Sequence, residues 1–304
     1  MARRRKGDAV DGVLLLDKPG GTTSNHALQA ARRLLNAAKA GHTGTLDPMA
    51  TGLLPLVFGE ATKFSADLLD ADKAYEATLA LGVRTTTGDA EGEIVETRPV
   101  AVGREQLEAV LACFTGTIEQ TPPMHSALKR DGRPLYEYAR RGIEIERAAR
   151  SVRIDRIDLL GFDGTRAQIA VACSKGTYVR TLAEDIGNAL GCGAHLAALR
   201  RTRVGRMTLD RAVTLAALEA MPPAVRREWL LPVDALLDDV PRVDLGDRQA
   251  ALFARGGQLD LGALPEGPGR RRVYGPGARL LGLAELDEHG VLNPRRLIAA
   301  QSPG

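Results

Sequence analysis

The most constraining feature of the sequence is the loop 41–52 (GHTGTLDPMATG), in which three glycines and three threonines surround one histidine and one carboxylate. Glycine permits sharp turns and lets the backbone approach another group closely. The loop lies between two apolar segments, 11–16 and 53–58, which have the length of buried strands. A polar, tightly turning loop in that position predicts a functional site, with His42 and Asp47 as its candidate side chains.

The segments around this loop predict both helices and strands. Residues 25–36 have apolar side chains at helical spacing and follow Thr22, Thr23 and Ser24, any one of which can cap a helix. Residues 73–83 alternate between apolar and polar, which is typical of a half-buried strand. Further helices are predicted at 61–69, 104–113 and 178–190, and paired strands at 152–160 and 167–173.

The length of 304 residues favours two domains of unequal size. Composition changes near Pro222, Pro223 and Pro232, which predicts a linker at about 230–239. We therefore expect a larger domain at 1–232 and a small, mostly β domain at 240–304. Residues 120–150 are rich in basic residues and show no clear periodicity, so we expect a projecting insertion there.

The sequence also predicts where the chain works. No window holds eighteen uncharged apolar residues in a row, which argues against a membrane span. The three cysteines are scattered and form no CxxC pair, which argues against a disulfide framework and favours a reducing compartment. We expect a cytoplasmic protein.

Arginine dominates the basic residues, since only seven of the 41 are lysine. A genomic bias toward GC-rich codons can produce this composition. The alternative is an anionic partner such as RNA, because the guanidinium group suits phosphates and stacked bases. The arginines cluster, with groups at 3–5, 140–141, 200–206, 226–227 and 270–272.

Asp47 has a structural explanation as well as a functional one. An aspartate followed by proline is a common helix start, with Asp47 as N-cap and Pro48 at the first helical position. No phosphate-binding GxxxxGK[ST] or dinucleotide-binding GxGxxG motif is present, which argues against a nucleotide-hydrolysing enzyme. No group of histidine, cysteine and carboxylate residues has metal-ligand spacing, so we expect no metal site.

Several motifs, in one order over about residues 12–205, resemble those of the TruB family of pseudouridine synthases. The first two surround the loop described above, and the others follow along the chain. The motifs are Gly12–Pro19 (GVLLLDKP), Gly41–Pro48 (GHTGTLDP), Gly52–Pro55 (GLLP), Lys73–Tyr75 (KAY), Pro122–Pro123, Ser126–Lys129 (SALK), Ser174–Arg180 (SKGTYVR), His195–Leu196 and Leu199–Thr202 (LRRT).

The resemblance implies a fold and a reaction. The fold would be α+β, with a mixed, largely antiparallel sheet, flanking helices and a small β-rich, PUA-like C-terminal domain. The reaction would be the isomerisation of uridine 55 in the T loop of tRNA to pseudouridine, without a cofactor. The family's partner is the T arm of tRNA, and we expect the chain to act as a monomer without a guide RNA. The segment 120–150 would then grip the RNA.

The resemblance also assigns roles to single residues. It implies that Asp47 is the catalytic aspartate, that Arg180 pairs with it, and that Tyr75 is the active-site tyrosine. A neighbouring arginine ordinarily lowers the pKa of an aspartate, so we expect Arg180 to keep Asp47 ionised. Without the family, Arg180 would read as a helix-surface charge and Tyr75 as a core residue.

Three further residues are implied to contact the substrate. Tyr178 and Leu199 match positions that line the uracil pocket, although ordinary packing would also explain both. His42 matches a histidine that stands beside the displaced nucleotide, while the other histidines, His125 among them, carry no such expectation. Two rival functions stay open: an RNA-binding module without catalysis, and a relative that acts on ribosomal RNA or with a guide RNA.

Overall fold

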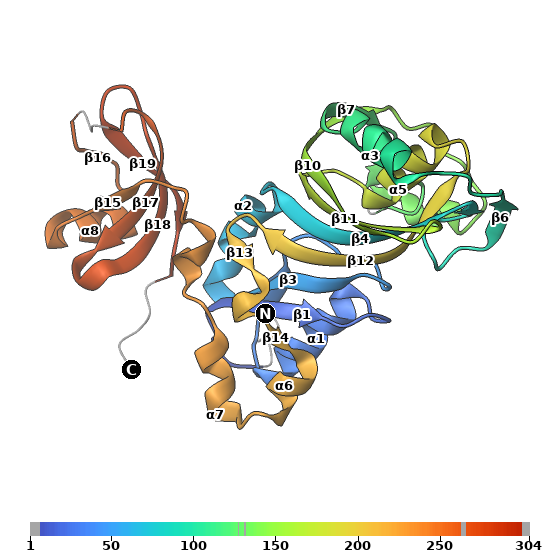
Figure 1. The fold of residues 1–304 in the computed structure, drawn as a ribbon. Coiled ribbons are helices and arrows are strands. Elements are labelled where there is room, and N and C mark those ends of the chain that lie inside the picture. Colours follow the sequence, from blue (N-terminus) through green and yellow to red (C-terminus); the bar gives the residue numbers. More distant parts are fainter. Residues whose placement is uncertain (1–6, 127, 131, 263–265, 300–304) are drawn as a thin grey trace.

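The computed structural model describes residues 7–126, 128–130, 132–262 and 266–299, so the arginine cluster at 3–5 and residue 127 of the SALK motif lie outside them. Its ten-stranded sheet has the strand order β14-β1-β3-β12-β4-β11-β10-β7, with β2 paired to β3 and β13 to β12 (Figure 1). The strands are β1 (Gly12–Lys18), β2 (Ala40–His42), β3 (Thr51–Phe58), β4 (Lys73–Leu81), β7 (Gly116–Gln120), β10 (Arg150–Phe162), β11 (Arg166–Cys173), β12 (Ala194–Val204), β13 (Met207–Thr208) and β14 (Val213–Thr214). The α+β class and the mixed, largely antiparallel sheet are as predicted.

The first part of the sheet forms because β1 and β3 are apolar on both faces. Along β1, Leu14 and Leu16 belong to one core cluster, whereas Val13 and Leu15 belong to another on the opposite face. A strand that is buried on both sides reads as a continuous apolar run, which is what the sequence shows. Helix α1 (Ser24–Leu34) is capped by Thr23, one of the three candidate caps, and packs on the first of these clusters.

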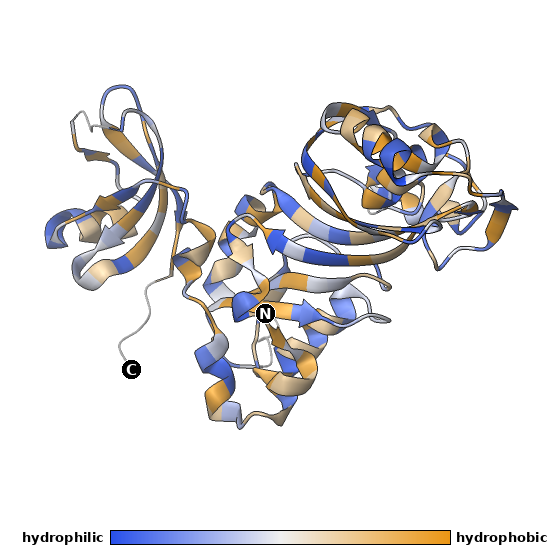
Figure 2. Ribbon diagram, viewed as in Figure 1, coloured by the Kyte–Doolittle hydropathy of each residue, from blue (hydrophilic) through white to orange (hydrophobic). Residues whose placement is uncertain are grey.

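The second part of the sheet consists of antiparallel neighbours covered by two helices. Strands β4, β11, β10 and β7 pair in that order, and β10 with β11 is the strand pair predicted from the sequence. Helices α3 (Arg104–Cys113) and α5 (Val179–Ala189) also form where predicted. Both carry hydrophobic and hydrophilic residues (Figure 2), and they bury their apolar faces against the sheet.

Strand β12 joins the two parts of the sheet. It runs parallel to β3, where Arg201 lies opposite Gly52, and antiparallel to β4, where Arg201 lies opposite Tyr75. Gly52 has a φ of +96°, and a Cβ at this position would lie 2.3 Å from the carbonyl oxygen of Arg201. Gly52, the last residue of the loop, is therefore required for β3 and β12 to approach each other.

The remaining elements of the larger domain are short. The segment 120–150 contains a small hairpin and one helical turn, and its ends are joined where Arg147 Nη1 donates a hydrogen bond to the Pro122 carbonyl at 3.0 Å. The short elements are η1 (Gly59–Phe64), α2 (Ser65–Leu69), β5 (Val83–Thr85), β6 (Ile94–Thr97), β8 (Lys129–Arg130), β9 (Arg133–Pro134), α4 (Leu135–Ala139), η2 (Leu209–Arg211), α6 (Leu215–Ala220), α7 (Pro223–Arg226), η3 (Arg227–Trp229) and η4 (Val233–Leu236).

The predicted linker at 230–239 is packed on the larger domain. Leu231 exchanges backbone hydrogen bonds with Val13, and Leu236 and Leu237 are buried in a core cluster of that domain. Leu283, from the C-terminal sheet, belongs to the same cluster. These leucines bury apolar surface, so the segment 230–239, called the connector below, is held against the larger domain.

The C-terminal residues form a second, five-stranded sheet with one helix (Figure 1), which agrees with the predicted β-rich module. Its strand order is β15-β17-β18-β19-β16. In the part of the chain that the structure describes, no helix is both long and apolar enough to span a membrane. The elements are β15 (Arg242–Asp244), α8 (Asp247–Ala254), β16 (Leu259–Asp260), β17 (Gly269–Gly275), η5 (Pro276–Ala278), β18 (Arg279–Leu286) and β19 (Val291–Leu297).

Candidate active site

Five of the six side chains predicted for the site line a single cavity of about 520 Å³. The cavity lies where the loop 41–52, β4, β12 and the start of α5 meet. His42, at the end of β2, is not among its lining residues. The five that line it are Asp47, Tyr75, Tyr178, Arg180 and Leu199.

Asp47 does not cap a helix. Residues 43–50 form turns and extended backbone between β2 and β3, so the helix-start interpretation of Asp47 and Pro48 was wrong. A fully buried ammonium fixes the backbone next to Asp47: Lys18 Nζ donates to the carbonyls of Thr22 at 2.7 Å and Pro48 at 3.3 Å. Contacts distant in sequence therefore override the local preference of an Asp-Pro pair for starting a helix.

Arg180 projects from the first turn of α5 and joins two carboxylates. Its Nε lies 3.2 Å from Asp47 Oδ2, and its Nη1 lies 3.4 Å from Asp89 Oδ2. Its Nη2 donates a 2.7 Å hydrogen bond to the His125 carbonyl. The side chains of Arg180 and Asp89 are only 8% and 4% exposed, so this ion pair lies inside the protein. The predicted pairing of Arg180 with Asp47 is present.

The electrostatic effect on Asp47 differs from the expectation. Burial raises the pKa of Asp47 above that of an ordinary aspartate, and this effect exceeds the lowering by Arg180. The neighbouring Asp89 raises the pKa of Asp47 further, because two nearby carboxylates disfavour each other's ionisation. The expected net lowering was therefore wrong. Water still reaches 39% of the Asp47 side chain, which limits the rise, and Arg180 opposes it.

Two tyrosines form walls of the cavity. Tyr75 lies on β4, and burial raises its pKa, although the neighbouring Arg201 guanidinium acts in the opposite direction. Tyr178 immediately precedes α5, and burial raises its pKa too. The Gln120 side chain holds the backbone of Tyr178, since its Oε1 accepts from the Tyr178 amide at 3.0 Å. Both phenols are therefore neutral at pH 7.

His42 is the last residue of β2, at the start of the loop. Its Nδ1 is buried without a hydrogen-bond partner among the described residues. Burial, with a smaller contribution from Arg201, lowers the pKa of His42, so the imidazole is neutral at pH 7.

Sequence reasoning missed three charged residues and one histidine. Lys18 belongs to the first motif, yet its full burial under the loop has no local signal. Asp89 had no motif at all, and its role as the second carboxylate on Arg180 depends on the fold. Arg201 was grouped with the arginines 200–206 as a candidate anion site, but it is only 1% exposed. His125, which carried no functional expectation, lines the cavity.

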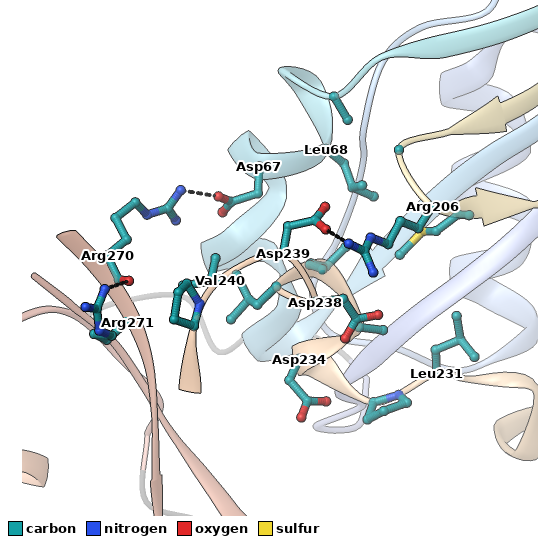
Figure 3. Close-up of a pocket in the computed structure, with 18 of the residues that line it drawn as sticks. Asp67, Leu68, Arg206, Leu231, Asp234, Asp238, Asp239, Val240, Arg270 and Arg271 are labelled. Atoms are coloured by element: carbon teal, nitrogen blue, oxygen red, sulfur yellow. Dashed lines mark hydrogen bonds and ion pairs between the residues drawn. The ribbon is translucent and has the colours of Figure 1, made fainter. Parts of the chain in front are cut away.

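A larger cavity of about 980 Å³ lies between α2, the β12–β13 turn, the connector and β17 (Figure 3). Two of the arginines around it have carboxylate partners: Arg270 pairs with Asp67 at 2.6 Å, and Arg206 pairs with Asp239. The predicted clusters 200–206 and 270–272 each contribute one of these pairs. Within the described residues, no three histidine, cysteine or carboxylate side chains are arranged to hold a metal ion.

Comparison with known proteins bears on what this cavity does. Three family models match successive parts of the chain. They are the TruB family pseudouridylate synthase (N terminal domain) at residues 32–179, the tRNA pseudouridylate synthase B C-terminal domain at 180–238, and Pseudouridine synthase II TruB, C-terminal, at 241–298.

Two curated relatives are similar over nearly the whole chain. A protein of Aromatoleum aromaticum named tRNA pseudouridine synthase B is 63% identical over 291 residues, which cover 95% of this chain and 93% of the relative. A protein of Dechloromonas aromatica with the same name is 60% identical over 299 residues, which cover 98% and 99% of the two chains.

Solved structures agree in fold. A chain in a Cbf5-Nop10-Gar1 complex superposes with a TM-score of 0.72 at 27% identity, covering 95% of this chain and 85% of that one. A chain in the archaeal box H/ACA sRNP Nop10-Cbf5 complex gives 0.71 at 26% identity, covering 95% and 86%. With the family models and the curated relatives, this likeness leads to one conclusion: the chain belongs to the TruB family and is a pseudouridine synthase.

Proposed function

We propose that this chain isomerises uridine 55 in the T loop of tRNA to pseudouridine. The observation that carries the proposal is the Asp47–Arg180 pair, at 3.2 Å, in a cavity with the aromatic walls Tyr75 and Tyr178. A volume of about 520 Å³ lies in the range of sites that enclose one small organic group. The names of the curated relatives support tRNA as the substrate.

The reaction breaks the N1–C1′ bond of the uridine and joins C5 to C1′. C5 loses a proton and N1 gains one, so the atoms balance without an oxidant, a reductant or a cofactor. Asp47 serves as the ionised carboxylate beside the sugar and the base, and Arg180 orients it toward the cavity. Because the pKa of Asp47 is raised, Arg180 is needed to keep the ionised form available near neutral pH.

Tyr75 stacks on the uracil and takes part in the transfer of the C5 proton. Its cross-strand neighbour is Arg201, whose guanidinium acts on the phenol from nearby. Leu199, on the same face of β12, and Tyr178 complete the walls around the base. A uracil that fills this cavity would displace water from the bond that must break and re-form.

The target base must leave its stack in the T loop before it can enter the cavity, which costs a few kcal/mol. We propose that His42 fills the space vacated by the base. A neutral imidazole suits this place, and the lowered pKa of His42 keeps it neutral.

The other parts of the chain would hold the tRNA. We propose that the segment 120–150 grips the T arm and that residues 240–304 form the PUA-like RNA-binding domain, with 1–232 as the catalytic domain. We also propose that the chain acts as a monomer and needs no guide RNA. Because tRNA is the substrate, we place the activity in the cytoplasm.

The test is tritium release from C5-labelled uridine in unmodified tRNA, with purified protein and no guide RNA. Release should occur, and a tRNA with cytidine at position 55 should yield no pseudouridine at that position. A pre-folded T-arm hairpin should react in EDTA, because the chemistry needs no Lewis acid. Binding of tRNA without any release would favour the module without catalysis, and release only after addition of a guide RNA would favour the guided relative.

A further inference from the structure

Arg201 is a buried cation with no carboxylate partner. Its side chain is the largest of those that are less than 2% exposed, and no carboxylate among the described residues lies within ion-pair distance of it. Burying a charge is costly unless its hydrogen-bonding groups are satisfied. The groups that Arg201 binds beside the catalytic cavity indicate what this buried cation does.

Its hydrogen bonds converge on the catalytic loop. Nε donates to the Leu53 carbonyl at 2.7 Å, at the start of β3. Nη2 donates to the Gly44 carbonyl at 3.1 Å, and Nη1 makes a longer contact of 3.5 Å with the Thr45 carbonyl. Gly44 and Thr45 lie three and two residues before Asp47, so the guanidinium fixes the backbone that carries the catalytic carboxylate.

The same guanidinium also reaches Tyr75. The two residues are direct partners in the β12–β4 register, and the guanidinium lies near enough to the Tyr75 phenol to act on its pKa. Arginine can only donate, so it can offer the phenol oxygen a hydrogen-bond donor and cannot accept from it. The uncompensated charge lowers the pKa of Tyr75 against the effect of burial, and it lowers that of His42 too.

We propose that Arg201 is a positioning residue for pseudouridine formation, which holds the Tyr75 hydroxyl and the Asp47 loop in one fixed geometry and does not contact RNA. The inference rests on the proposed role of Tyr75. A guanidinium that is 1% exposed has no surface for a phosphate, which separates Arg201 from the surface arginines of the same strand.

The experiment is a double-mutant cycle with Arg201→Gln and Tyr75→Phe, together with Arg201→Lys. Arg203→Gln is the matched control, because Arg203 lies on the same strand and donates only to the Gly205 carbonyl. Arg201→Gln should leave the Kd for tRNA within two-fold and lower kcat about 100-fold, as expected when a reacting group is misplaced. The control should change kcat by less than two-fold.

In the Tyr75→Phe background, Arg201→Gln should lower kcat less than about five-fold, because the hydroxyl that Arg201 positions is already absent. In the single variant, the limb of the kcat–pH profile that depends on Tyr75 should move to higher pH, since the cation that favours the phenolate is absent. Arg201→Lys should fall between wild type and Arg201→Gln. Wild type, the two single variants Arg201→Gln and Tyr75→Phe, and the double variant also form a double-mutant cycle in melting temperature. A non-additive change in that cycle would report the Arg201–Tyr75 contact independently of activity.

Equal losses in both backgrounds, or an unshifted pH limb, would overturn the proposal in favour of a purely structural role. A loss confined to the Kd would make Arg201 an RNA ligand. If neither Arg201→Gln nor Arg201→Lys folds, the residue is a scaffold element and the proposal fails. If wild type forms no pseudouridine, the proposed function fails instead. The melting-temperature cycle then decides this inference, because zero coupling there refutes the contact.

Discussion

Replacing Arg180 by lysine tests the central ion pair while preserving its charge. The guanidinium contacts Asp47 and Asp89 through different nitrogen atoms, at 3.2 and 3.4 Å, and a third nitrogen binds the His125 carbonyl. A lysine carries one compact ammonium on a stem that cannot reproduce this planar fork. We expect it to keep one carboxylate contact and to lose the other.

The magnitude follows from the lost contact. A hydrogen bond to a charged group contributes about 1.5–3 kcal/mol. If Asp47 loses it, that energy corresponds to a decrease in kcat of roughly ten- to 150-fold, since each 1.36 kcal/mol is a factor of ten. Arg180→Ala should be worse, because it leaves Asp89, 4% exposed, without its cation. The pKa of Asp47 should then rise further, and the acid limb of the pH–rate profile should move to higher pH.

The assay is single-turnover tritium release from a pre-folded T-arm hairpin, measured across a pH series. Arg153→Lys is the matched control: this arginine is 56% exposed and pairs with Asp72 and Asp155 at the surface, where ion pairs contribute little. The control should retain nearly full activity. A wild-type rate in Arg180→Lys, or an unmoved acid limb in Arg180→Ala, would show that the pair does not control Asp47.

Three further predictions concern stability and RNA binding. Asp47→Asn should abolish turnover and leave the affinity for tRNA within a few-fold of wild type. Because folding raises the pKa of Asp47, its ionised form destabilises the folded protein. The variant should therefore have a higher melting temperature than wild type at pH 7, and this difference should disappear as the pH falls through that pKa. Residual activity above a tenth would contradict the assignment. Gly52→Ala should lower the melting temperature, since its Cβ would lie 2.3 Å from the Arg201 carbonyl oxygen. An unchanged melting curve by circular dichroism would show that β3 and β12 do not require a glycine at this position. A chain that ends at residue 239 should fold but bind whole tRNA more weakly, and the salt dependence of its affinity should be smaller by roughly 0.7–0.9 per lost phosphate contact. A chain that ends at residue 232 should have a lower melting temperature, because it lacks the buried leucines of the connector.

Local elements were predictable because their signals are local. The helix at 104–113 was predicted with its observed bounds, and the strand from Lys73 followed from alternation alone. The pairing of β10 with β11 also followed, since the two segments are neighbours in the sequence. The five cavity residues were found through the order of the family motifs, which periodicity could not supply.

The electrostatics and the buried charges were not predictable, because they depend on contacts between distant segments. Arg201 stands in a run of arginines that looks like a basic patch, and only the strand register buries it between β3 and β4. The expected lowering of the Asp47 pKa considered one neighbour, whereas burial and Asp89 outweigh it. The prolines mark the connector in the sequence, but the burial of Leu236 and Leu237 depends on contacts with distant segments.

The position of β12 in the middle of the sheet has a consequence for how the protein matures. Its partners β3 and β4 leave the ribosome early, but β12 ends only at Val204, and translation to that point takes roughly 10–40 seconds at 5–20 residues per second. Until then, the segment that bears Asp47 and the one that bears Arg180 have no strand to join them. A nascent chain therefore cannot form a working cavity, and catalytic competence arises in one late step of synthesis.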